Sequence, residues 1–314
     1  MRCSRPITAY RLINKTDSGK HAIVFHMPRG KEILYETIQL PCGKCPDCLL
    51  NHAQMWSLRC SHEAEFHTEK CFLTLTYDRN HVPFNNGYKT LEYKDVQLFL
   101  KRLRKDLSKS GIKIRFFCSG EYGGNKCRPH YHMILFGFTP KDLTFFRTSY
   151  SGLPIFRSKY LEEKWKCGYV FVGTVTSESA GYVARYSMDK QKNKGEKFYE
   201  YREKELLRMS RRNGIGFDWI SKWYRTVYNL GYIKHDNCKM RIPRFYFTFL
   251  EKNFKILYLR LKNRLKKYAL NFLKIIKLND KYDKMLFHRY NISENYRISV
   301  VSRLRRNLTH DLVE

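Results

Sequence analysis

The pattern of apolar and polar positions predicts a chain that contains both strands and helices. Apolar residues recur at intervals of three and four over residues 95–107, which is the spacing of one helix face, and residues 53–68 have a similar pattern. Residues 139–165 are expected to be rich in loops. Short runs of β-branched and aromatic residues predict strands at residues 10–13, 33–38, 71–78, 112–122, 128–136 and 168–175.

Residues 112–122 and 128–136 are predicted to form an antiparallel hairpin, because glycine and asparagine separate them at a turn. Side chains alternate between the faces of a strand, so His130 and His132 point the same way. If Glu121 lies opposite His130, its carboxylate shares their face. The same register puts apolar residues on the other face as a core, namely Ile114, Phe116, Cys118, Tyr131, Met133 and Leu135.

Glu121, His130 and His132 therefore form a candidate metal site. One carboxylate and two imidazoles suit Mg²⁺ or Mn²⁺ bound with open coordination positions. The alternative is a strand whose two histidines bind nothing, because short motifs give false matches. One register that explains both a buried face and a clustered polar face favours the metal site.

A second cluster is formed by Cys42, Cys45 and Cys48, which are two residues apart from one another and flanked by Pro and Gly. This spacing lets the sulfurs face one metal ion, and it predicts a structural zinc site. The alternatives are an iron–sulfur cluster and free thiols in a tight turn. Candidates for the fourth zinc ligand are, in order of preference, Cys3 and then Cys60 and His52.

A third motif follows residue 176, where Thr176 or Ser177 can cap a helix. Tyr182, Tyr186 and Lys190 are four residues apart and would lie on one face of that helix. In a generic helix such an aromatic pair packs into a core. Beside a metal site, however, a tyrosine hydroxyl is a credible nucleophile toward a phosphodiester.

The charge of the chain points to nucleic acid as its partner. There are 60 Lys and Arg against 29 Asp and Glu, a formal charge of +31, and 15% of the residues are aromatic. Such a chain attracts polyanions and can stack on single-stranded bases, whereas an anionic membrane surface is the alternative. No apolar run is long enough to span a membrane or to form a signal peptide, so we expect a cytoplasmic protein. Residues 245–276 predict one or two basic amphipathic helices.

The order of these motifs resembles the HUH endonucleases that initiate rolling-circle replication. The nearest likeness is to the replication initiators of small single-stranded DNA phages, the Microviridae of the gokushovirus type. It extends over about residues 40–240. The segments that carry it are residues 72–78, 120–123, 128–132 and 182–186, together with 41–45 and 209–212.

The resemblance implies an α+β fold with a ferredoxin-like or RRM-like core around a central antiparallel sheet. Residues 1–52 would then form an N-terminal cysteine-rich segment, residues 53–240 the HUH endonuclease core and residues 241–314 a basic helical extension.

The resemblance also implies a mechanism. A metal ion at the His-His-Glu site would polarise a phosphate of single-stranded origin DNA, in a supercoiled or single-stranded viral genome, and Tyr182 and Tyr186 would act as alternating nucleophiles. The family often has two lysines after the second tyrosine, whereas this chain has Asp189 and Lys190. The chain has no P-loop, which implies a separate host helicase and a host polymerase in the host cytoplasm. The competing hypotheses are a non-catalytic single-stranded nucleic-acid-binding protein with a zinc knuckle, and a relaxase or transposase of the same chemistry.

Overall fold

The computed structural model describes residues 3–17, 19, 21–30, 32–124, 126–149, 152–176, 183, 195–235 and 238–277, with side chains as far as residue 271. The chain forms two compact units, residues 1–52 and residues 53–314. Its mixed α+β architecture, with a large antiparallel sheet and a cysteine cluster near the N-terminus, confirms the predicted fold class.

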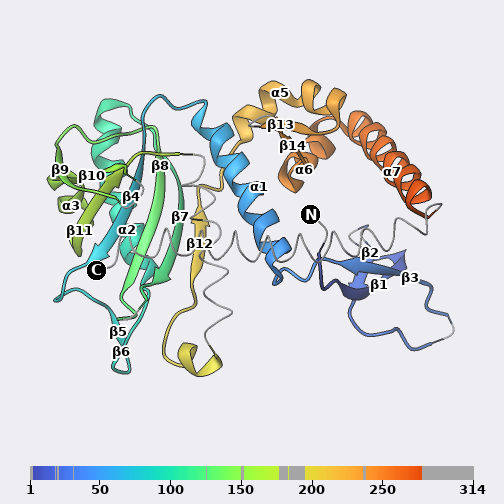
Figure 1. The fold of residues 1–314 in the computed structure, drawn as a ribbon, viewed down its shortest axis with the longest axis horizontal. Coiled ribbons are helices and arrows are strands. Elements are labelled where there is room, and N and C mark those ends of the chain that lie inside the picture. Colours follow the sequence, from blue (N-terminus) through green and yellow to red (C-terminus); the bar gives the residue numbers. More distant parts are fainter. Residues whose placement is uncertain are drawn as a thin grey trace. The chain divides into compact units, whose positions relative to one another are not determined.

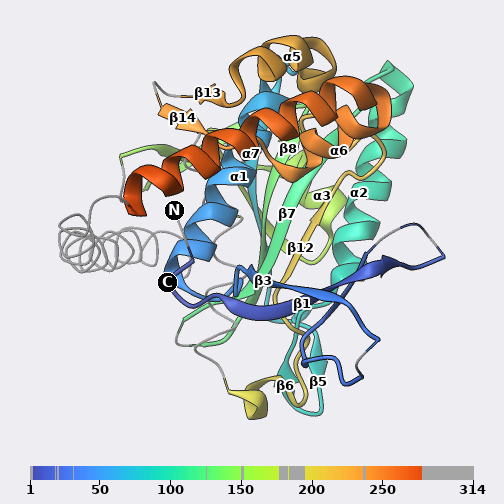
Figure 2. The ribbon, with the colours of Figure 1, turned by 90° about the vertical axis from the view of Figure 1, so that its right-hand side faces the viewer.

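The first unit contains a three-stranded antiparallel sheet in the order β2-β1-β3 (Figure 2). These strands are β1 (Ile7–Lys15), β2 (His21–Val24) and β3 (Tyr35–Leu40), and two of them contain the strands predicted at residues 10–13 and 33–38. The cysteine loop follows β3, and α1 (Pro46–Ala64) begins there and continues into the second unit. This helix starts earlier than predicted because Pro46 is well tolerated in a first helical turn, where its missing N–H costs nothing.

In the second unit, seven of the described strands form one antiparallel sheet in the order β12-β7-β8-β4-β11-β10-β9 (Figure 1). The strands predicted at residues 71–78, 112–122, 128–136 and 168–175 are all present, with ends that differ by up to three residues. The seven strands are β4 (Lys70–Tyr77), β7 (Arg115–Tyr122), β8 (Pro129–Phe136), β9 (Leu143–Thr148), β10 (Pro154–Ser158), β11 (Gly168–Gly173) and β12 (Leu206–Met209).

The main core lies between one face of this sheet and two helices, α2 (Tyr93–Leu107) and α3 (Lys159–Trp165) (Figure 1). The helix predicted over residues 95–107 is α2, and its five predicted apolar positions are all buried. The six apolar residues assigned to this face of the hairpin also belong to the core, as predicted.

The opposite face of the sheet packs against α1 near its C-terminal end. Trp56 and Cys60 of that helix contact a cluster that includes Phe117, Ile134 and Phe136. Leu58 faces a further cluster, which it forms with the remaining helices, α5 (Phe217–Leu230), α6 (Arg244–Asn253) and α7 (Lys255–Lys277) (Figure 2).

The basic helices predicted over residues 245–276 are thus α6 and α7. Because they share a hydrophobic cluster with α1 and α5, the boundary expected after residue 240 does not separate two compact units, and the three-part division stays a prediction. Among the described residues, none of the helices combines the length and apolar character needed to cross a bilayer.

The expectation that residues 139–165 are rich in loops is wrong. They contain β9, β10 and α3. The pattern concealed these elements because β9 is exposed along almost its whole length and lies at the edge of the sheet, so it lacks an apolar face. The side chain of Ser158 caps α3 by accepting a hydrogen bond from the backbone N–H of Leu161, at 3.2 Å.

The short elements complete the structure without adding to either large core. They are the strands β5 (Phe84–Asn85), β6 (Tyr88–Lys89), β13 (Ile233–His235) and β14 (Cys238–Met240), with the 3₁₀ helices η1 (Ser108–Ser110) and η2 (Glu196–Tyr199).

Gly168, at the start of β11, should not tolerate a side chain. Its φ is +143°, and a Cβ there would lie 2.4 Å from the backbone N of Asp78 and 2.5 Å from the backbone O of Thr76. We expect Gly168→Ala to lower the free energy of unfolding by about 3 kcal/mol. Gly173 is the matched control, because it ends the same strand and its added Cβ would meet nothing within 4 Å. Denaturant unfolding measures both variants, and an equal effect of the two would contradict this reading.

Candidate metal centre

The register of the β7–β8 hairpin is the predicted one. Glu121 lies opposite His130, and Ser119 lies opposite His132. The next strand continues the same rows, because β4 places Thr76 opposite His130 and Thr74 opposite His132. Directly opposed residues share a face of the sheet, so the carboxylate and both imidazoles lie on one side. We call this side the histidine face.

Glu121, His130 and His132 are brought together at the centre of the sheet. Each offers one ligand atom, and these atoms lie within 4.8 Å of one another. Nε2 of His132 is 3.3 Å from Oε1 of Glu121, and the two imidazole centroids are 4.9 Å apart. All three residues are buried, with at most 3% of their surface exposed. A carboxylate and two imidazoles in so small a volume are a suitable donor set for a hard divalent cation.

Both imidazoles are held through Nδ1. Nδ1 of His130 is 3.1 Å from the backbone carbonyl of Arg128, and Nδ1 of His132 is 3.2 Å from the hydroxyl of Thr74. When Nδ1 donates its proton to such an oxygen, the lone pair of the ring is on Nε2, which is the form that binds metals. Phe72 stacks on His132, with ring centroids 5.6 Å apart, and restricts its rotation.

Sequence reasoning did not find the orienting role of Thr74. Its shared face with Thr76 was visible, but its partner His132 lies 58 positions away and is reached only through the pairing of β4 with β8. Thr76 has a different role, because its hydroxyl donates to the backbone carbonyl of Tyr169, at 3.3 Å.

Tyr182, Tyr186 and Lys190 lie outside the described residues, so their role stays a prediction. Their neighbour Val183 is described and fully buried. It belongs to the cluster that contains Phe117 and Ile134, which lie opposite each other in the β7–β8 pair. Ile134 shares its parity with His130 and His132, so Val183 packs on the histidine face.

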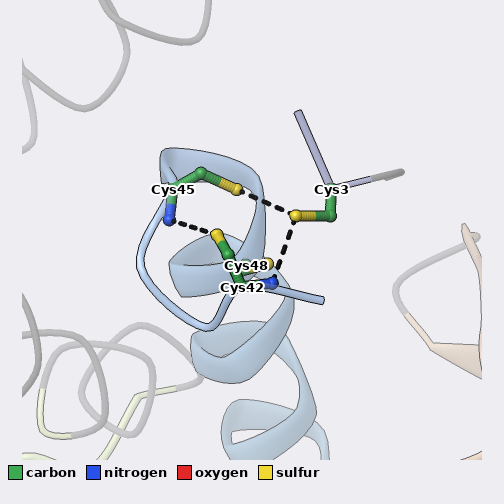
Figure 3. Close-up of side chains that lie close together, drawn as sticks. All are labelled: Cys3, Cys42, Cys45 and Cys48. Carbon is green, nitrogen blue, oxygen red and sulfur yellow. Dashed lines mark hydrogen bonds between the residues drawn. The ribbon is translucent and has the colours of Figure 1, made fainter. Parts of the chain in front are cut away.

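A second candidate metal site lies in the first unit. The sulfurs of Cys3, Cys42, Cys45 and Cys48 lie within 4.8 Å of one another, and Figure 3 shows the side chains converging at the start of α1. The Sγ atoms of Cys3 and Cys45 are 3.7 Å apart. Backbone N–H groups point at the sulfurs, because Cys42 N donates to Cys3 Sγ at 3.3 Å and Cys45 N donates to Cys42 Sγ at 3.2 Å.

The members of this second cluster differ in acidity. Burial opposes ionisation of Cys45, but hydrogen bonds from Ser4 and from the Cys48 backbone outweigh it and lower the pKa of this thiol to about 6. Burial, together with the nearby Cys45 and Cys3 sulfurs, raises the pKa of Cys48 to about 12. Of the three candidates for the fourth ligand, Cys3 lies in the cluster, whereas Cys60 packs beside Trp56 in the other unit.

Comparison with known proteins gives consistent relatives. Residues 70–192 match the family model of replication-associated proteins of the ORF2 type. The chain is 32% identical over 260 residues to "Replication-associated protein VP4" of Bdellovibrio phage phiMH2K, an alignment that covers 81% of this chain and 78% of that protein.

Two further relatives carry similar names. The chain is 30% identical over 258 residues to "Replication-associated protein ORF4" of Chlamydia phage 1, covering 78% of this chain and 61% of that protein. It is 31% identical over 240 residues to "Replication-associated protein ORF2" of Spiroplasma virus 4, covering 73% and 72%. No solved structure matches.

Proposed function

Because the chain belongs to the family of phage replication-associated proteins, we propose that it initiates viral DNA replication by nicking single-stranded origin DNA through a tyrosine nucleophile. The observation that carries this proposal is the buried row of Glu121, His130 and His132 on one face of a rigid sheet. The burial of Val183 on the same face supports it, because this residue lies between the two candidate nucleophiles in the sequence.

Glu121, His130 and His132 would hold a Mg²⁺ or Mn²⁺ ion, which when bound supplies Lewis-acid polarisation of the scissile phosphate. Thr74 and the carbonyl of Arg128 keep the two imidazoles in the tautomer and orientation that this requires. The site is built on adjacent strands of a sheet, so these side chains are positioned before the substrate arrives.

The hydroxyl oxygen of Tyr182 or Tyr186 forms a bond to the phosphorus, and the bond from phosphorus to the 3′-oxygen breaks. The phenol proton is lost and the leaving 3′-oxygen gains a proton, so the products are a 5′-phosphotyrosine linkage and a free 3′-hydroxyl. A phosphodiester is kept throughout, which allows the strand to be rejoined later. Lys190 would stabilise negative charge nearby.

The free 3′-hydroxyl would serve a host polymerase as a primer, with strand separation by a host helicase in the host cytoplasm. The second tyrosine would let one molecule cut a newly made origin while the first tyrosine still holds the old 5′-end.

The experiment that tests the function uses overlapping labelled single strands that cover the phage genome encoding this chain. Each is incubated with the protein and Mn²⁺, and the products are separated in SDS. We expect one strand to give an SDS-resistant protein–DNA adduct that EDTA prevents. Tight binding of single strands with no adduct at any sequence would favour the non-catalytic binding protein instead. Cleavage of plasmid-transfer or transposon-end sequences in place of viral ones would favour a relaxase or transposase.

We also propose that Cys3, Cys42, Cys45 and Cys48 bind one structural zinc ion. Zn–S bonds of about 2.3 Å in a tetrahedron place the sulfurs about 3.8 Å apart, and the observed 3.7 Å between Cys3 and Cys45 agrees with this value. An iron–sulfur cluster distributes its thiolates over several iron atoms and so holds them further apart. The ion would join the segment before β1 to the first turn of α1.

Cys45→Ser should therefore remove the zinc and lower the melting temperature of the chain, because metal binding and folding are coupled at structural sites. Elemental analysis of the purified protein gives the metal content, with one zinc per chain expected in the wild type. Cys238→Ser is the control, since Cys238 is exposed and lies outside the cluster. Iron with inorganic sulfide in the wild type, or zinc retained in Cys45→Ser, would contradict the assignment.

A further inference from the structure

The histidine face extends beyond the metal ligands across two more strands. Tyr169 of β11 lies opposite Thr76, and Thr76 lies opposite His130. Phe171 lies in the neighbouring row, opposite Thr74. Since opposed residues share a face, both aromatic side chains lie on the same side of the sheet as the candidate metal site. Two strand spacings separate β8 from β11, which is about 10 Å.

A third aromatic ring joins this surface from β9. The ring centroid of Phe146 is 5.0 Å from that of Phe171, at an interplanar angle of 45°. Tyr169 and Phe146 are each 46% exposed, although aromatic rings of this size are usually covered in a sheet. We call Phe146, Tyr169 and Phe171 the aromatic platform.

An arginine supports the platform from β10. Arg157 lies opposite Phe171, and its guanidinium is 5.0 Å from the ring centroid of Tyr169. Nε and Nη2 of Arg157 each donate to the carboxylate of Glu162, at 2.9 Å. This bidentate pair fixes the guanidinium and neutralises its charge, so Arg157 is a rigid support for the Tyr169 ring. Its contribution to phosphate attraction is correspondingly small.

We propose that the aromatic platform is a base-stacking site for nucleotides that flank the scissile phosphate in single-stranded DNA. This inference rests on the proposed function, because it takes the neighbouring metal site as the place of cleavage. Unpaired bases expose their faces and stack on aromatic side chains without regard to sequence. The platform lies on the same face as the metal ligands, at a distance that a few nucleotides cover.

The chemistry of the surface favours a nucleic acid over a protein partner. The rings are separated by polar neighbours, because Thr144 and Arg157 are paired in the adjacent row and Tyr169 itself carries a hydroxyl. The chain as a whole has a formal charge of +31, which complements a polyanion and repels a second copy of itself. A docking surface for a protein would be expected to be more continuously apolar at its centre.

The test measures the binding of a fluorescein-labelled oligothymidylate by fluorescence anisotropy, in EDTA so that no cleavage occurs. Tyr169→Ala and Phe146→Ala should each weaken binding by about 5- to 100-fold. Tyr169→Phe keeps the ring and should bind as the wild type does. Because neither ring binds a phosphate, the slope of log affinity against log salt concentration should remain unchanged in every variant.

Phe145 is the matched control. It is the immediate neighbour of Phe146 and is more exposed, at 64%. It lies opposite Phe156, which packs against the main core, so Phe145 lies on the other face of the sheet. We expect Phe145→Ala to bind the oligonucleotide with wild-type affinity. The melting temperature of each variant shows whether it is folded.

The proposal is overturned if Tyr169→Ala and Phe146→Ala bind as the wild type does, or if Phe145→Ala loses as much affinity as they do. It is also overturned if the alanine variants change the oligomeric state in sedimentation, since the platform would then be an interface between copies. The adduct assay separates this inference from the function. Platform variants that lose binding support it even if the wild type never forms an adduct, whereas wild-type nicking with unaffected platform variants contradicts the platform alone.

Discussion

His132→Ala is expected to lower the rate of Mn²⁺-dependent strand cleavage by about a thousandfold or more, which corresponds to about 4 kcal/mol of transition-state stabilisation. The imidazole of His132 is fully buried between Thr74 and Glu121, and its removal takes away one of the two nitrogen ligands. Binding of single-stranded DNA in EDTA should change little, because that interaction depends on charge and aromatic stacking elsewhere on the chain. The initial rate of adduct formation at saturating Mn²⁺ measures the effect.

Because His132 lies in the interior, loss of activity must be separated from loss of folding. Glu121→Gln is the second variant, since it keeps the size of the side chain and removes the charge that a metal ion requires. His81→Ala serves as the control imidazole, because His81 is an exposed residue outside the cluster. Folded His132→Ala and Glu121→Gln proteins that cleave at the wild-type rate would eliminate this site as the metal centre.

Replacing both Tyr182 and Tyr186 with phenylalanine should abolish the covalent adduct altogether. The phenyl rings preserve packing, whereas the two hydroxyl oxygens are the proposed nucleophiles. Each single variant should still form an adduct through the remaining hydroxyl, at a reduced rate. Gel electrophoresis in SDS with labelled DNA measures all three variants.

Tyr88→Phe is the matched control for the two tyrosines, since Tyr88 is an exposed tyrosine on the short β6 strand. It should form the adduct at the wild-type rate. An adduct that persists in the double variant would show that another side chain attacks the phosphate, and the assignment of both tyrosines would fall.

The hairpin could be predicted from the sequence because everything that determines it is local. Alternation fixes which residues share a face, the intervening turn brings the strands together, and the placement of Glu121 opposite His130 follows from one register that satisfies both faces. The support from Thr74 and the aromatic platform could not be predicted in this way. They depend on the pairing of β4 with β8 and with β11, which joins residues far apart in the chain.

The cysteine cluster shows the same division. Cys42, Cys45 and Cys48 were recognised from their spacing, whereas Cys3 was chosen because a tetrahedral ion needs a fourth ligand, and it lies in the cluster. The exposed edge of the sheet at β9 and β10 was missed because edge strands with two polar faces lack the alternation that reveals a strand. Tyr182, Tyr186 and Lys190 stay predictions from the sequence.

The most direct test of the account is to identify the side chain that carries the DNA. The wild-type adduct is formed with Mn²⁺, digested with protease and nuclease, and analysed by mass spectrometry. The account predicts a nucleotide joined through its 5′-phosphate to Tyr182 or Tyr186, and none when His132 is replaced by alanine. A nucleotide attached to any other residue, or the same adduct formed without a divalent metal, would contradict it.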